Sequence, residues 1–100
     1  MILEVANLKI KQEEMSNFET AFPKAAQIIS SIPGYISHEL QRCVETKGRY
    51  VLLVRWASIE AHKVNFQQSP KFQEWRALMG GFNAERPAAE HFERVTESRI

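Results

Sequence analysis

The stretch that decides the fold reads Arg49-Tyr-Val-Leu-Leu-Val-Arg-Trp56, then Ala57-Ser-Ile-Glu-Ala-His62-Lys-Val-Asn65-Phe66, then Ser69-Pro70-Lys-Phe72-Gln-Glu-Trp75-Arg76. Its first part is an apolar run of strand length that ends in a tryptophan. Its second part predicts a helix capped by Ser58, and its third part predicts another helix opened by Pro70. Aromatic and polar side chains that gather around such a junction are typical of a small-molecule pocket.

Strand signals recur at four places along the chain, over residues 2–10, 35–45, 49–57 and 89–97. Thr46-Lys47-Gly48 predicts a hairpin turn between the second and third strands. With helices between the other strands, the order predicts an α+β fold, a ferredoxin-like antiparallel sheet with helices on one face, in a single domain over residues 1–100.

The first of these strands is apolar on both faces, so its outer face also needs a cover. A second copy of the same sheet would supply that cover, which predicts a symmetric homodimer packed sheet to sheet. The sequence leaves open whether the last strand stays in its own sheet or crosses to the partner.

The first long helix is predicted from an amphipathic stripe of apolar side chains spaced by three and four residues. Ser16 and Glu19 have the spacing of a capping box at its start. Pro23 lies inside the stripe and predicts a kink or a short break, because proline lacks the amide of the helical hydrogen bond. Pro33-Gly34 predicts the end of the helix.

Composition excludes several classes of protein. The 100 residues are 44% hydrophobic and 25% charged, with a formal net charge of +1. Lysine and arginine form no cluster of the kind that nucleic-acid binding requires. The single Cys43 cannot form an internal disulfide, which fits a reducing compartment. We find neither a signal-peptide pattern nor a membrane-spanning run, so the sequence favours a cytoplasmic protein.

At this point the chain resembles the antibiotic biosynthesis monooxygenase superfamily, the dimeric α/β-barrel proteins. The most specific matching residues are Pro33-Gly34-Tyr35, Trp56, the segment from His62 to Phe66, Ser69-Pro70 and Phe72. The superfamily includes cofactor-independent oxygenases of aromatic polyketides and quinols, haem-degrading enzymes, and members without an established activity.

The resemblance implies roles for particular positions. In the polyketide-oxidising branch a tryptophan at the end of the third strand matches Trp56, and an arginine on the third helix matches Arg76. That branch has a tyrosine where this chain has His62, and a strand asparagine where it has Leu52. The haem-degrading branch implies an asparagine in the first strand, which Asn7 matches, but its axial histidine falls near Trp75 or Arg76.

The candidate catalytic residues are His62, Trp56, Asn7 and Arg76. The unperturbed pKa of histidine, about 6.5, suits His62 as a general base, and the other three could stabilise an anion by donating hydrogen bonds. A packed histidine, a core tryptophan, a structural amide and a solvated arginine are the corresponding alternatives. The candidate substrate pocket comprises Asn65, Phe66, Phe72, Trp75 and Met79, for most of which core packing is the alternative.

The leading hypothesis is therefore a cofactor-independent monooxygenase that oxidises a small phenolic or quinol-type aromatic with dioxygen. Neither a metal site nor a cofactor site is predicted, since the three histidines lack ligand spacing and there is no glycine-rich phosphate loop. Two alternatives stay open: a non-catalytic dimer that binds a small molecule or supports a pathway partner, and a haem-binding or haem-degrading protein.

Overall fold

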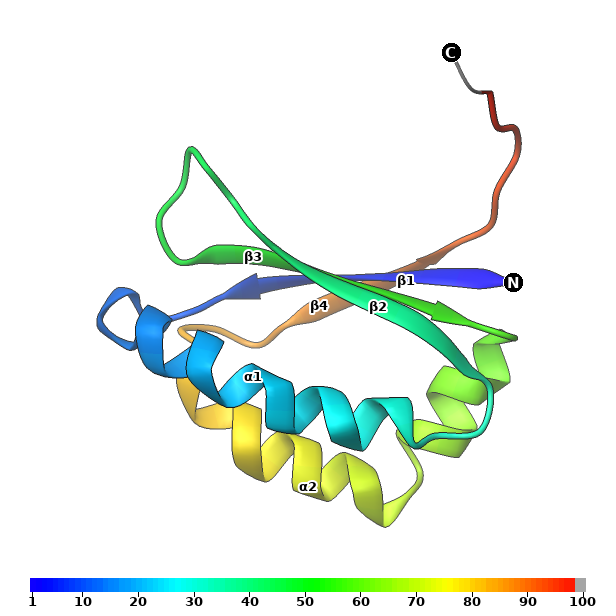
Figure 1. Ribbon diagram of the computed structural model, residues 1–100, viewed down its shortest axis with the longest axis horizontal. Helices are drawn as coiled ribbons and strands as arrows, with labels where there is room; N and C mark the ends of the chain where they lie inside the picture. Colours follow the sequence, from blue (N-terminus) through cyan, green and yellow to red (C-terminus); the bar gives the residue numbers. More distant parts are fainter. Residues whose placement is uncertain (99–100) are drawn as a thin grey trace.

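The computed structural model describes residues 1–98 and shows a four-stranded sheet with its helices on one face (Figure 1). The strands are β1 (Ile2–Lys9), β2 (Tyr35–Arg42), β3 (Arg49–Trp56) and β4 (Ala88–Phe92). The longer helices are α1 (Met15–Ser30) and α2 (Pro70–Met79), and the short helical segments are η1 (Gln12–Glu14), η2 (Ala61–Phe66) and η3 (Gly80–Phe82).

The sheet has the order β2-β3-β1-β4, and each neighbouring pair is antiparallel. Strands β2 and β3 form the predicted hairpin. The chain runs from β1 through α1 and β2 before β3 returns to pair with β1. The predicted ferredoxin-like α+β fold is confirmed. Strand β4 pairs with β1 at the edge of the chain's own sheet, and it ends at Phe92 rather than near residue 97.

The core lies between the sheet and the two helices. Strand β3 alternates strictly, and its inward side chains Tyr50, Leu52, Val54 and Trp56 are all at most 3% exposed. Opposite them, α1 buries Phe18, Phe22, Ala25 and Ile29, the predicted amphipathic stripe. A strand that places four buried side chains against a helix in this way explains why residues 49–56 dominate the fold.

The start of α1 differs from the prediction. The helix begins at Met15, directly after the η1 turn, so Ser16 lies inside it and no side chain caps its first residue. The predicted capping box is therefore wrong. The helix also continues through Pro23 without a break, because Phe22 and Ala25, on either side of the proline, are both held in the core.

Two glycines have a positive φ, and one of them positions the functional region. Gly34 (φ +93°) ends the α1–β2 connection, and a Cβ atom there would lie 2.5 Å from the Cβ atom of Ala61. Only glycine lets η2 pack this closely against the connection. The side chain of Asn65 reinforces the contact by donating a hydrogen bond of 2.9 Å to the carbonyl of Pro33.

Candidate functional site

A cavity of about 740 Å³ lies between the helix-covered face of the sheet and the helices. Its wall is mostly apolar and aromatic, with contributions from β1, β3, α1, η2, α2 and the connection into β4, and includes Ala6, Leu8, Phe18, Phe22, Ile29, Leu52, Phe66, Phe72, Trp75 and Met79. Its polar lining includes Glu4, His62, Gln67, Arg76 and Arg86. This size and composition are those of a small-molecule site.

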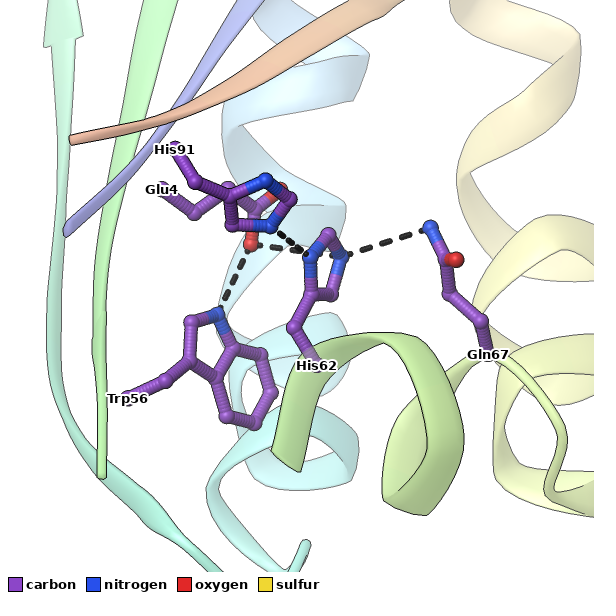
Figure 2. A network of polar contacts seen from close by, with 5 residues as sticks. All are labelled: Glu4, Trp56, His62, Gln67 and His91. Carbon is purple, nitrogen blue, oxygen red and sulfur yellow. Dashed lines mark hydrogen bonds and ion pairs between the residues drawn. The ribbon is translucent and has the colours of Figure 1, made fainter. Parts of the chain in front are cut away.

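Four polar side chains form a connected cluster at the sheet end of the cavity (Figure 2). The indole N–H of Trp56 donates a hydrogen bond of 2.9 Å to Oε1 of Glu4. The same oxygen lies 3.4 Å from Nε2 of His62, and Nδ1 of His62 lies 2.8 Å from Nε2 of His91. Every buried side-chain nitrogen and oxygen in the described part of the chain has a hydrogen-bond partner.

The sheet register brings these residues together from distant parts of the sequence. Glu4 on β1 lies directly opposite His91 on β4, and both face the helices. Trp56 ends β3 opposite Ile2, which lies two residues before Glu4 on β1 and therefore on the same face. The cluster is thus built on three neighbouring strands, which hold side chains more rigidly than loops do.

His62 comes from η2, a single turn of π-helix. The amide of Gln67 donates to the carbonyl of His62 across five residues, over 3.0 Å. Before this turn the hydroxyl of Ser58 accepts a hydrogen bond of 3.2 Å from the amide of Ala61, which confirms the predicted cap. π-Helical turns are frequent at functional sites, and this one places the imidazole parallel to the indole of Trp56, with ring centres 5.3 Å apart.

Burial shifts both central groups of the cluster towards their uncharged forms. The pKa of His62, which is 4% exposed, is lowered from 6.5 to about 4, first by burial and then by the positive charges of His91 and Lys63. The pKa of Glu4, 6% exposed, is raised by burial, and its hydrogen bond from Trp56 opposes that rise. At neutral pH His62 is therefore an uncharged imidazole and a weaker base than a free histidine, and its contact with Glu4 is not a simple ion pair.

The lowered pKa of His62 predicts a pH-dependent stability. Between pH 6.5 and about 4 the unfolded chain binds a proton at this histidine that the folded protein does not bind, so the free energy of unfolding falls as the pH falls through this window. The loss should be on the order of 3 kcal/mol. Urea unfolding at pH 7 and pH 4.5 checks it. The decrease in the free energy of unfolding from pH 7 to pH 4.5 should be distinctly smaller in His62→Gln than in the wild type. An equal decrease in both proteins would contradict the prediction.

The structure places most of the predicted site residues around the cavity. His62, Arg76, Phe66, Phe72, Trp75 and Met79 line it. Trp56 is fully buried behind the wall, where it supports Glu4 and His62. Leu52 also lines the cavity, so the position of the family's strand asparagine belongs to this site but carries an apolar side chain.

Two predicted residues lie elsewhere. Asn7 is exposed on the outer face of the sheet, since β1 alternates and directs Glu4, Ala6 and Leu8 towards the helices. The side-chain amide of Asn65 donates its hydrogen bond to the carbonyl of Pro33, and Asn65 is not among the residues that line the cavity. Asn7 as a donor to substrate and Asn65 as a pocket residue are therefore corrected: in this chain one occupies the outer face and the other anchors η2.

Sequence reasoning missed Glu4, Gln67 and His91. Nε2 of Gln67 lies 3.4 Å from Nε2 of His62, on the side away from His91 (Figure 2). A signal for Glu4 was present, because a carboxylate in an otherwise apolar strand is as unusual as an asparagine there. For His91 the sequence offered no comparable signal, since its pairing with Glu4 depends on the β1–β4 register.

Within residues 1–98 no group of three or more histidine, cysteine, aspartate or glutamate side chains is arranged to hold a metal ion. Among the same residues, no helix has both the length and the apolar character needed to cross a membrane.

Comparison with protein families gives one clear match: the model of the antibiotic biosynthesis monooxygenase family matches residues 1–78. The uncharacterized protein YczJ of Bacillus subtilis (strain 168) is 44% identical over 95 residues, which cover 95% of this chain and 100% of YczJ.

Solved structures show the same fold. A crystal structure from Bordetella bronchiseptica, described as an antibiotic biosynthesis monooxygenase, is 34% identical and superposes with a TM-score of 0.91 over 95% of this chain and 97% of its own. SnoaB, a cofactor-independent oxygenase from Streptomyces nogalater, superposes with a TM-score of 0.79 at 18% identity, over 96% of this chain and 94% of its own.

Proposed function

Because this chain belongs to the antibiotic biosynthesis monooxygenase family, we propose that its cavity oxidises a small, flat phenolic or quinol-type substrate with dioxygen and without a cofactor. The observation that carries the proposal is an uncharged, buried imidazole, His62, which faces an aromatic-walled cavity. The description of SnoaB as a cofactor-independent oxygenase supports this class of chemistry for the fold.

The cavity walls suit a flat aromatic substrate. Phe66 is perpendicular to both Phe72 and Trp75, with ring centres 5.2 Å and 5.8 Å apart, so the aromatic wall presents both ring faces and ring edges. Such surfaces bind aromatic rings by stacked or edge-to-face contact. Arg76 and Arg86 line the cavity with exposed side chains, and their charge favours the anion formed from the substrate.

The reaction divides into steps that need only these residues and dioxygen. Nε2 of His62 accepts the proton of an acidic O–H or C–H bond and leaves an electron-rich anion in the cavity. The anion transfers one electron to dioxygen, and the two radicals combine into a peroxide on the ring carbon. The peroxide anion takes the proton back from His62. Loss of water, whose second hydrogen comes from the same ring carbon, then leaves one oxygen atom on the ring as a quinone carbonyl. The apolar wall excludes bulk water from this sequence.

Dioxygen consumption by metal-free and flavin-free protein tests the proposal against a panel of anthrones, naphthols and quinols. We expect uptake above the spontaneous rate for at least one flat substrate, with one quinone formed per dioxygen. Binding of panel members without oxygen uptake would contradict the proposal and favour the non-catalytic binding protein. The haem alternative finds no support in α2, which carries Trp75 and Arg76 but no histidine.

A homodimer is part of the proposal, since the outer face of the sheet carries a group of apolar side chains. Leu3 and Val5 of β1, Leu53 of β3 and Phe92 of β4 share this face, and Phe92 is 49% exposed. A monomer rarely leaves such a contiguous patch in water. Packing against the same face of a second copy would cover it.

Leu53→Glu should convert the dimer into monomers, because it would bury two unpaired carboxylates in the centre of the sheet-to-sheet interface. Light scattering during size-exclusion chromatography measures the mass. Val64→Glu is the matched control, since Val64 lies on η2 and is 46% exposed. A wild-type protein that is monomeric at micromolar concentration, or a Leu53→Glu protein that stays dimeric, would contradict this assembly.

A further inference from the structure

We infer that His91 is the outlet of a two-histidine proton relay, through which the proton taken up by His62 inside the cavity leaves for solvent. This inference rests on the proposed function for the identity of the proton donor. The geometry of the relay itself is independent of the substrate, since it concerns only His62, His91 and their surroundings.

The two rings are arranged so that a proton can pass from the cavity towards the surface of the protein. Nε2 of His62 lies on the cavity side, next to Glu4 and Gln67, while Nδ1 lies 2.8 Å from Nε2 of His91. His91 is half-buried on β4, the edge strand of the sheet, so its remaining nitrogen has a route to water. Figure 2 shows the two rings next to each other; His62 lines the cavity, and His91 lies on the edge strand.

Charge explains why such an outlet is needed. A proton that stayed on His62 would create a buried imidazolium ion, which desolvation and the positive charge of Lys63 disfavour at pH 7. A neutral imidazole can instead accept a proton at one nitrogen and release one from the other. The relay removes the proton without holding a positive charge on the buried imidazole.

The substrate's O–H or C–H bond breaks and its proton bonds to Nε2 of His62, while the proton on Nδ1 of His62 passes to Nε2 of His91. His91 then loses the proton on its own Nδ1 to water. Both rings end neutral in the opposite tautomer, and reversing the transfers returns a proton to the reduced oxygen of the product.

The other polar groups around the cavity favour proton transfer from His62 to His91. Glu4 of β1 accepts a hydrogen bond from Trp56 of β3 and offers the same oxygen to the new Nε2–H of His62. Arg76 of α2 and Glu85 and Arg86 of the connection before β4 also line the cavity, whereas the lining residues of α1 are apolar. Burial, and then the charge of Lys63 next to His62 on η2, lowers the pKa of His91 as well, so both rings are neutral at pH 7.

Two measurements test the relay. In the first, oxygen uptake by His91→Ala should fall at least about tenfold at unchanged KM, less than the loss expected for a missing general base. Added imidazole should restore it in proportion to the imidazole concentration, because the small base can occupy the emptied space. A wild-type rate in His91→Ala, or a lowered rate that imidazole leaves unchanged, would overturn the relay.

The second measurement needs no substrate and so separates failure of the relay from failure of the proposed function. Nitrogen NMR of the histidine rings should show His62 and His91 titrating as a coupled pair, and the pKa of His62 should rise from about 4 in His91→Gln, since one of its lowering charges is gone. His38→Gln is the control, because His38 lies on β2 and pairs with Tyr35. A His62 titration that His91→Gln leaves unchanged would overturn the relay even if oxygen uptake is never found.

Discussion

Replacing His62 by alanine is expected to lower turnover by about 10²-fold or more, the effect of losing a general base. The expectation follows from its position, since His62 lines the cavity and its Nε2 lies between Glu4 and Gln67. Steady-state oxygen uptake with the best panel substrate measures the effect, which should appear in kcat rather than in KM, because proton removal occurs after binding.

Val64→Ala is the matched control for this variant. Val64 lies on the same helical turn but is 46% exposed, so its truncation should leave turnover within about twofold of the wild type. Thermal unfolding of all proteins shows whether the turn remains folded. Full activity in a folded His62→Ala protein would remove His62 from the mechanism and leave the cavity without its base.

Replacing Trp56 by alanine is expected to lower the free energy of unfolding by about 3–5 kcal/mol, the usual cost of deleting a large buried aromatic side chain. Trp56 is fully buried, with its indole between Glu4, His62 and Phe66. The variant also removes the N–H that satisfies the Glu4 carboxyl, and an unsatisfied buried group costs about 1–3 kcal/mol.

Trp56→Phe separates the two contributions to this loss. It keeps much of the aromatic packing but removes the donor to Glu4, so its cost should lie well below that of alanine. Denaturant unfolding measures both variants, with Val64→Ala again as the control. A Trp56→Ala protein destabilised by less than about 1 kcal/mol would show that the tryptophan does not hold the site together.

The fold was predictable because its signals are local and strong. The apolar run over residues 49–56 and the helical stripe behind it specify a strand and a helix without tertiary information. Helix ends were less predictable: Ser16 and Glu19 have capping-box spacing, but the chain enters α1 through the η1 turn and the helix starts before the serine. Local spacing cannot reveal how a preceding turn sets the first helical residue.

The site was predictable in part, and strand alternation explains the division. Asn7 and Glu4 are both polar residues in an apolar strand, three positions apart, so they must face opposite sides of the sheet. The sequence alone does not say which side meets the helices, and the prediction chose the asparagine. His91 depends on the β1–β4 register, a long-range pairing that a single sequence does not encode locally.

The measurement that tests the central claim most directly is the exchange of the acidic C–H proton of an anthrone with deuterium from the solvent, followed by NMR without oxygen at pH 7. We expect the wild type to exchange this proton at least about a hundredfold faster than His62→Ala, because His62 removes the proton whether or not dioxygen is present. Exchange at the spontaneous rate in the wild type, or exchange that is equally fast in His62→Ala, would contradict the assignment of this cavity as a base-driven oxygenase site.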